Sequence, residues 1–145
     1  MKGYERGSPV RSYVVGMSEI PAGYEDLLTR PLFGHFATVR PDGNPAVTPM
    51  WFSWDGEVLR FTHTTRRAKL RNIEHNRHVA LSVLDPDEPY RYLQARGEVE
   101  SVEPDPTGAF YLELAVRYGR EYPAPPPDAP DRVIISVRPF AYSKQ

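Results

Sequence analysis

Proline is the feature of this sequence that most restricts its fold. Sixteen of the 145 residues are proline, about twice the usual share of roughly 5%. Proline removes a backbone donor and breaks a helix interior, so this content argues against a helical bundle. A chain of 145 residues is a common length for one domain. The sequence therefore favours one domain of strands joined by fixed turns.

Turn signals separate several apolar segments that we expect to be strands. These segments are residues 35–40, 46–54, 57–64, 79–84, 90–102 and 132–137. The turns Pro41–Asn44 and Asp55-Gly56 join the first three, which are predicted to form an antiparallel meander. Gly97 inside the fifth segment predicts a bulge or a sharp bend. A small barrel accommodates such strands without exposed edges.

Short helices are expected between some of these strands. They are predicted at residues 24–29, 67–76 and 106–118. In the last one, Phe110, Leu114 and Tyr118 recur four apart and mark an inner face. The segment 122–130 holds five prolines and is expected to be an extended loop. Residues 1–21 are expected to form an N-terminal arm, with a short strand at 13–15, before a domain at 22–145.

Composition excludes several classes of function. The absence of cysteine rules out disulfides, cysteine-based zinc sites, iron–sulfur clusters and thiol nucleophiles. A net charge of −1 argues against a nucleic-acid partner. No signal peptide and no long apolar run is visible, so we expect no membrane partner and a cytoplasmic location.

Residues 60–78 concentrate positive charge. This segment carries six arginines and lysines against the single Glu74. The cations fall where a predicted strand ends and a helix begins, a place that suits a bound anion. Hydroxyl donors from Thr62, Thr64 and Thr65 lie in the same segment. The sequence therefore indicates a phosphate-bearing ligand, with a solvated charged face as the alternative.

The segment 47–54 is rich in aromatic residues. If it is a strand, Met50, Phe52 and Trp54 share one face, and Pro49, Trp51 and Ser53 share the other. One face must enter the core. The other face is a possible platform for a planar ring, or a surface covered by a partner subunit.

Known catalytic and metal motifs are not found. His75 and His78 are three residues apart, but no carboxylate stands at a ligand-like spacing, and we expect no metal site. The motifs GxSxG, GxGxxG and GxxxxGK[ST] do not occur either.

Several runs in the sequence resemble the pyridoxamine-5′-phosphate-oxidase-like split β-barrel superfamily. These runs are residues 36–45, 49–52, 59–62 and 65–73. The spacing of Arg67, Lys69, Arg71 and Asn72, together with the runs 90–97, 117–122 and 132–137, most resembles the coenzyme F420-dependent branch, the flavin/deazaflavin oxidoreductases of the B type. The resemblance covers about residues 22–140. It implies a mainly β (α+β) fold, a six- to seven-stranded antiparallel split β-barrel with a few short helices.

This resemblance also implies a homodimer with two cofactor sites at the subunit interface. The cofactor phosphate would lie against Arg67 and Lys69, beside Arg66. Thr62 and Thr65 would assist as hydroxyl donors. The ring would lie along the five residues Thr48, Pro49, Met50, Trp51 and Phe52. Tyr90 and Tyr92 would approach it from the neighbouring chain.

Coenzyme F420 would explain the excess of positive charge. It carries an oligoglutamate tail besides its phosphate, and Arg66, Arg71 and Arg77 remain available for that tail. Pyridoxamine phosphate oxidase carries a C-terminal arginine motif for its substrate. This sequence shows no such motif, so we do not expect vitamin B6 oxidation.

The function expected from these observations is a reductase. It would transfer a hydride from reduced coenzyme F420 to a small planar unsaturated substrate, with no acid or base assigned. FMN is the alternative cofactor and would give a flavin reductase or oxidase. A non-catalytic cofactor- or tetrapyrrole-binding protein is a third hypothesis. A dimeric barrel whose basic strip is only surface is the fourth.

Overall fold

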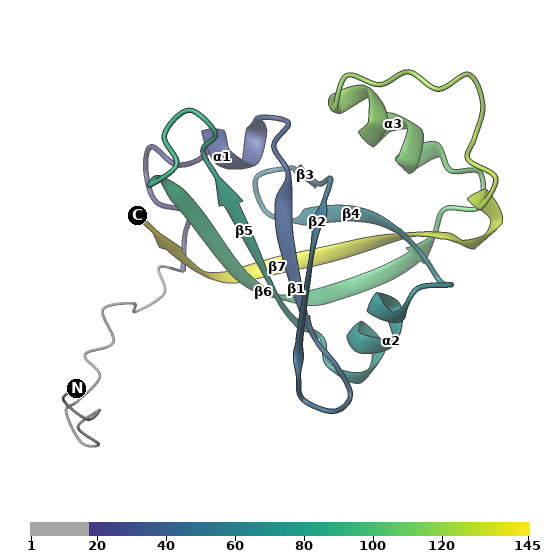
Figure 1. Cartoon of the computed structure of the whole chain (residues 1–145), viewed down its shortest axis with the longest axis horizontal. Coiled ribbons are helices and arrows are strands. Elements are labelled where there is room, and N and C mark those ends of the chain that lie inside the picture. Colours follow the sequence, from purple (N-terminus) through teal and green to yellow (C-terminus); the bar gives the residue numbers. More distant parts are fainter. Residues whose placement is uncertain (1–17) are drawn as a thin grey trace, which may run out of the picture.

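A computed structural model describes residues 18–145, so the strand predicted at 13–15 lies outside the described residues. The described part is mainly β, with short helices between the strands (Figure 1). The strands are β1 (Gly34–Val39), β2 (Pro45–Met50), β3 (Ser53–Trp54), β4 (Leu59–Thr64), β5 (His78–Leu84), β6 (Tyr92–Pro104) and β7 (Arg132–Lys144). The helices are α1 (Asp26–Thr29), α2 (Ala68–His75) and α3 (Ala109–Arg117), with a 3₁₀ turn at Ala129–Asp131.

All seven strands form one antiparallel sheet. Their order is β2-β1-β5-β6-β7-β4-β3. The two outer strands, β2 and β3, are separated in the chain only by Trp51 and Phe52. The sheet must therefore curl until its two ends meet, which confirms the predicted split barrel.

Both pairings of the predicted meander are present, but its middle strand is not continuous. β2 pairs with β1, whereas β3 pairs with β4, and β4 pairs on its other side with β7. The strand predicted at 46–54 is interrupted at Trp51 and Phe52. Pro49 has no N–H to donate, and it lies on β2, an outer strand of the order, where this lack is tolerated. Both predicted turns, at Pro41–Asn44 and Asp55-Gly56, do join antiparallel pairs.

Three phenylalanines form the centre of the core. Phe36, Phe52 and Phe61 are fully buried, and the rings of Phe36 and Phe61 lie 4.5 Å apart between centroids. Burial of each such side chain contributes about 1.5–3 kcal/mol. Met50 and Trp54 belong to the same core, so the predicted alternation of residues 50–54 is confirmed despite the break in the strand.

The long pair β6 and β7 carries an irregularity at Gly97. The pairing register shifts between Arg96 and Gly97, and Gly97 lies opposite Pro139. A Cβ atom at Gly97 would lie 2.6 Å from the carbonyl oxygen of Arg138, so only glycine fits there. The bulge predicted at Gly97 is thus confirmed. β7 runs well past its predicted end at Val137, because Pro139 is accommodated at this irregularity.

The helices hold positions outside the sheet. α2 follows β4 and turns Leu70 and Ile73 into the core. α3 begins at Ala109 rather than Pro106, because Gly108 before it adopts a left-handed conformation with φ of 68°. α3 and the proline-rich loop after it connect β6 to β7 and stand beside β3 and β4 (Figure 1). No helix in residues 18–145 is long and apolar enough to cross a membrane.

Candidate functional site

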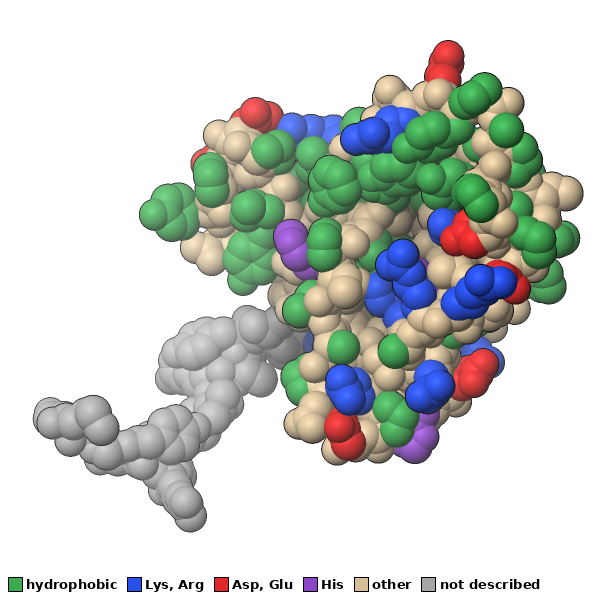
Figure 2. Space-filling model, turned by 45° about the vertical axis from the view of Figure 1, so that its right-hand side comes forward, with side chains coloured by type: hydrophobic (Ala, Val, Ile, Leu, Met, Phe, Trp, Pro, Cys, Tyr) green, Lys and Arg blue, Asp and Glu red, His purple; other side chains and the backbone are tan. Residues whose placement is uncertain are grey.

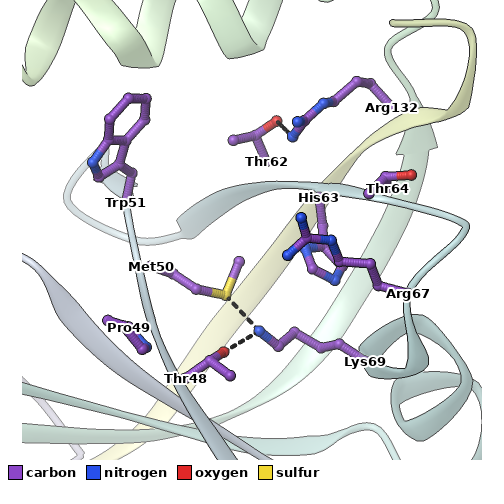
Figure 3. A pocket seen from close by; sticks show the side chains of 10 residues that line it. All are labelled: Thr48, Pro49, Met50, Trp51, Thr62, His63, Thr64, Arg67, Lys69 and Arg132. Atoms are coloured by element: carbon purple, nitrogen blue, oxygen red, sulfur yellow. Dashed lines mark hydrogen bonds between the residues drawn. The ribbon is translucent and has the colours of Figure 1, made fainter. Parts of the chain in front are cut away.

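A cavity of about 330 Å³ opens where β2, β4 and α2 come together (Figure 3). Its lining is polar or cationic on one side and contains an aromatic ring on the other. The lining residues are Thr48, Pro49, Met50, Trp51, Thr62, His63, Thr64, Arg67, Lys69 and Arg132. No aspartate or glutamate is among them. The cavity is therefore suited to an anion.

Two of the cations come from the start of α2. Arg67 precedes the helix and Lys69 lies in its first turn, which has no capping side chain and no acidic residue. Lys69 reaches across to β2, where its ammonium group donates to the hydroxyl of Thr48 and lies 3.2 Å from the sulfur of Met50. These are weak partners for a cation. Within residues 18–145 neither cation has an acidic partner, and the helix dipole is unopposed, so this end of α2 attracts an anion.

Buried polar contacts fix the position of α2. Asn72 is buried and donates from its side-chain nitrogen to the hydroxyl of Thr38 on β1, at 3.0 Å. The side chains of Leu70 and Ile73 are also buried, so the helix packs against the core through these residues. Lys69, one position before Leu70, is therefore held at the edge of the core rather than free in solvent.

The third cation is the first residue of β7. Arg132 forms two hydrogen bonds with the carboxylate of Asp128, both at 3.1 Å. Its guanidinium also lies 3.4 Å from the hydroxyl of Thr62 and 4.5 Å from the ring centre of Tyr111. Part of its charge is thus neutralised, and its orientation is fixed before any ligand binds.

Burial and the neighbouring cations lower the pKa of two groups in this cavity. Burial is the larger cause for the His63 imidazole, whose pKa is lowered to about 4. The positive charges of Lys69, Arg67 and Arg132 act in the same direction. Burial, reinforced by Arg67, lowers the pKa of the Lys69 ammonium group to about 8. A bound anion would raise both pKa values, because it favours the protonated forms.

His63 lines this cavity and carries a buried polar atom without a partner. The residue is 7% exposed, and its Nε2 atom has no hydrogen-bond partner among the described residues. A buried polar atom of this kind costs free energy unless a ligand or water satisfies it. The Nε2 atom has almost no accessible surface, so this cost falls on the fold beside the cavity.

The structure brings seven of the twelve predicted site residues to this cavity. They are Thr48, Pro49, Met50, Trp51, Thr62, Arg67 and Lys69. Phe52 follows them in the chain, but its side chain is fully buried in the core and does not face the cavity. Thr65 is exposed on the turn after β4, where its N–H donates to the carbonyl of Asp131, and Thr64 lines the cavity instead. Arg66 turns away and pairs with Asp131 at 2.7 Å.

Tyr90 and Tyr92 lie outside the cavity of their own chain. Tyr90 is 83% exposed in the loop before β6, and Tyr92 pairs with Leu84 at the start of that strand. Ion pairs of Arg91 with Asp26 and Asp85 hold this loop against α1. The approach of the two tyrosines from a neighbouring chain stays a prediction.

Three lining residues were missed by the sequence reasoning. Arg132 is distant in sequence, and only the pairing of β4 with β7 brings it beside Thr62. No spacing or motif in the sequence singles out His63. Thr64 was noted only as a hydroxyl near the cations. The positive charge of residues 60–78 is the one sequence feature that points to a site near His63 and Thr64. Arg132 lies outside that segment.

A second cavity, of about 390 Å³, adjoins the first. Thr48 and Lys69 line both, and the second also contains Arg71, Arg40 and Asp42, whose carboxylate pairs with Arg40 at 3.5 Å. Arg71 has no ion-pair partner among the described residues, whereas Arg77 donates to the carbonyl of Val99 at 2.8 Å. Figure 2 shows Lys and Arg side chains gathered around a hollow, with a band of hydrophobic side chains above it.

An aromatic group borders the first cavity on the side of α3. The indole of Trp51 stacks on the ring of Tyr118, with 5.1 Å between centroids and 12° between planes. Tyr111 lies 6.3 Å from Trp51 and stacks in turn on Tyr122. The cavity thus has a cationic side and an aromatic side. In the part of the chain that the structure describes, no cluster of three or more histidines or carboxylates could hold a metal ion.

Comparisons with known proteins show which family the chain belongs to. The family model of pyridoxamine 5′-phosphate oxidase matches residues 20–145. A solved structure of an F420 reductase is 67% identical, with a TM-score of 0.85, over 87% of this chain and all of that chain. No curated protein matches.

More distant solved structures share the fold. HupZ from Group A Streptococcus is 20% identical, with a TM-score of 0.63, over 86% of this chain and 93% of that chain. A conserved hypothetical protein from Mycobacterium tuberculosis is 20% identical, with a TM-score of 0.66, over 88% of this chain and 86% of that one. The resemblance seen in the sequence is confirmed, and the chain belongs to the pyridoxamine 5′-phosphate oxidase family.

Proposed function

We propose that this oxidoreductase transfers a hydride from reduced coenzyme F420 to a small planar unsaturated substrate. The observation that carries the proposal is the cavity in which Arg67 and Lys69 lie opposite the ring of Trp51, with no acidic partner in the described part of the chain. The 67% identity to an F420 reductase supports the choice of cofactor.

The described residues fit the phosphate of such a cofactor. The cavity lining supplies three cations, two threonine hydroxyls on β4 and the first turn of α2, and it supplies no carboxylate. Charge-assisted hydrogen bonds of this kind are roughly twice as strong as neutral ones. Arg67, Lys69 and Arg132 would hold the phosphate, and the hydroxyls of Thr62 and Thr64 would complete its contacts.

β2 and the link after it would hold the ring. Pro49 and Trp51 alternate with the buried Met50 and Phe52, so their side chains lie on the side of the chain away from the core. The bound deazaflavin ring supplies the hydride, and the chain's own residues bind and orient it. Trp51 would limit the space beside the ring and exclude water from that side. A planar, hydrophobic substrate fits this aromatic border best.

The tail of coenzyme F420 would lie in the second cavity. Arg71 lines that cavity without an ion-pair partner among the described residues, Arg40 lines it paired with Asp42, and Lys69 is common to both cavities. A ligand with one phosphate can use only the first cavity. A ligand with further carboxylates can use both, which favours coenzyme F420 over FMN.

FMN is the second candidate cofactor. The first cavity alone meets the needs of a single phosphate, and the remaining cations would then be surface charges. Such exposed charges contribute little to the stability of the protein. The two cofactors therefore differ in whether the second cavity takes part in binding.

A homodimer is proposed as the assembly that completes the site. The outer surface of β1, β5 and β7 carries a shallow hollow of about 320 Å³, lined by Ala37, Val39 and Phe140 among others. Phe140 is 50% exposed there. A second copy would cover this apolar surface, and it would offer Tyr90 and Tyr92 to the site as the resemblance implies.

The experiment separates binding from turnover. Purified protein is titrated with reduced F420, FMN and NADPH, and then assayed without oxygen against a panel of quinones, enones and tetrapyrroles. We expect reduced F420 to bind to the protein and to be oxidised by at least one quinone or enone. Binding without turnover of any acceptor would favour a non-catalytic carrier, and preferential binding of FMN would favour a flavin enzyme.

A further inference from the structure

The chain between β2 and β3 is held by α3 rather than by the sheet. The N–H of Phe52 donates to the hydroxyl oxygen of Tyr118 at 3.0 Å. The carbonyl of Phe52 accepts from Nε of Arg117, also at 3.0 Å. Two consecutive residues at the end of one helix therefore satisfy both backbone groups of Phe52, at the point where strand pairing stops.

Further hydrogen bonds fix this end of α3. The Tyr118 hydroxyl donates to the carbonyl of Leu32 at 2.7 Å. The guanidinium of Arg117 donates to the carbonyls of Leu28, Thr29 and Arg30 at the end of α1, at 2.9 to 3.1 Å. Tyr118 thus accepts one hydrogen bond and donates another, so its ring has little freedom to move. Burial raises the pKa of Tyr118, so the hydroxyl keeps its proton at neutral pH.

The same ring supports Trp51. The two ring planes lie within 12° of each other at a centroid separation of 5.1 Å. Trp51 lines the cavity and Tyr118 does not. Figure 3 shows the indole on the side of the cavity nearest the helix drawn at the top of the view. Trp51 therefore depends on a residue behind it for its orientation.

We infer that Tyr118 is a positioning residue for the cavity. Its hydroxyl replaces the missing strand pairing at Phe52, and its ring sets the plane of the Trp51 indole that borders the bound ring. The role assigned to the indole rests on the proposed function, whereas the support of Trp51 by Tyr118 does not. The two parts can be tested separately.

The first test measures the support itself. Trp54→Phe leaves Trp51 as the only tryptophan, and it removes an indole N–H for which the described residues supply no acceptor. In that background, Tyr118→Phe keeps a ring for stacking but loses both hydrogen bonds. We expect acrylamide to quench Trp51 emission more strongly in this variant. Unchanged quenching in a folded Tyr118→Phe protein would overturn the inference.

The second test measures the effect on the ligand. We expect Tyr118→Phe to weaken F420 binding by at most about three- to tenfold, because a freer Trp51 and Phe52 must be ordered again when the ligand binds, at a cost no greater than the neutral hydrogen bond that ordered them. Binding of inorganic pyrophosphate, which needs only the cationic side of the cavity, should be unchanged. The matched control is Tyr142→Phe, which removes the hydroxyl of another buried tyrosine, far along β7. It should leave both affinities unchanged.

The outcomes separate the inference from the proposed function. If F420 fails to bind the wild-type protein while quenching still increases in Tyr118→Phe, the cofactor is wrong and the positioning stands. If F420 binds wild type and variant equally, the positioning role is overturned.

A measurement on the wild-type protein keeps the inference testable even if the variant unfolds. The amide of Phe52 should exchange slowly with solvent, although it lies outside the strands. Rapid exchange would contradict its hydrogen bond to Tyr118.

Discussion

The ammonium group of Lys69 on α2 lies 3.2 Å from the sulfur of Met50 on β2, so one side chain spans the cavity between helix and strand. Its other partner is the hydroxyl of Thr48. Neither partner neutralises the charge. Among residues 18–145 Lys69 has no anionic partner, so a phosphate in the cavity would supply one. The free energy of that contact would appear as ligand affinity rather than as stability of the fold.

Removing either helix cation should weaken cofactor binding and leave the fold intact. Lys69→Ala and Arg67→Ala each lose a charge-assisted contact worth about 1.5–3 kcal/mol. This corresponds to roughly ten- to hundredfold in affinity. Binding titrations are paired with thermal melts of each ligand-free variant. Arg138→Ala is the control, since Arg138 pairs with Glu100 away from the cavity and should not affect affinity. Unchanged affinity in both helix variants would place the phosphate elsewhere.

Arg66→Ala should cost less affinity than Arg67→Ala. The guanidinium of Arg66 is committed to Asp131 at 2.7 Å and does not line the cavity. The same titration, run on both variants at one salt concentration, compares the two neighbours directly. Equal losses would show that Arg66 leaves Asp131 when the ligand binds.

Affinity for an anionic ligand should fall as pH rises above about 8. The pKa of Lys69 in the ligand-free protein is lowered to about 8 from an ordinary value of 10.5. An anion binds more tightly when the Lys69 side chain is protonated. Raising the pH through this pKa deprotonates Lys69 and therefore weakens binding. Binding measured from pH 7 to pH 10 should show the decline, and Lys69→Met should flatten it. A flat profile in the wild type would mean that Lys69 stays protonated throughout this range.

The fold should lose stability in mild acid through His63. The pKa of this residue is lowered to about 4 from an ordinary value of 6.5. The unfolded chain therefore binds a proton at a higher pH than the folded chain does. Its contribution to stability is full above pH 6.5 and is lost as the pH falls towards 4. Urea unfolding from pH 7 to pH 4 should show a steeper loss in the wild type than in His63→Phe.

The elements that follow from local chemistry were predictable from the sequence. Asp55-Gly56 forms its turn because Gly56 adopts a φ of 102° and Asp55 accepts hydrogen bonds from the next backbone amides. Gly97 predicted an irregularity, because only a residue without a Cβ fits there. The cluster of Arg67 and Lys69 predicted the cationic side of the cavity, because consecutive residues at a helix start stay together in the fold.

Features that depend on distant pairing were not predictable. Arg132 reaches the cavity only because β7 pairs with β4. The predicted strand at 46–54 breaks at Phe52 because Tyr118, far along the chain, supplies its hydrogen bond. The family resemblance implies a cofactor ring along residues 48–52, whereas the strand alternation places the side chain of Phe52 in the core, and the structure confirms the alternation. Local patterns cannot report such partners, because the contacts form only in three dimensions.

Salt should weaken F420 binding more than FMN binding. Arg40 and Arg71 are exposed in the second cavity, where dissolved ions screen their charges over a length of about 8 Å at physiological ionic strength. Only a ligand with a charged tail reaches them. Arg71→Ala should therefore reduce the salt dependence of F420 binding and leave FMN binding unchanged, as measured by titration at several salt concentrations.

Parallel titrations of the wild-type protein with F420 and FMN test the central claim most directly. Both ligands are measured across the same series of salt concentrations, with binding followed by the distinct absorbance of each ring. F420 should bind more tightly at low salt, and its advantage should narrow as salt rises, because the second cavity engages only the charged tail. Tighter binding of FMN at every salt concentration would contradict the assignment to coenzyme F420.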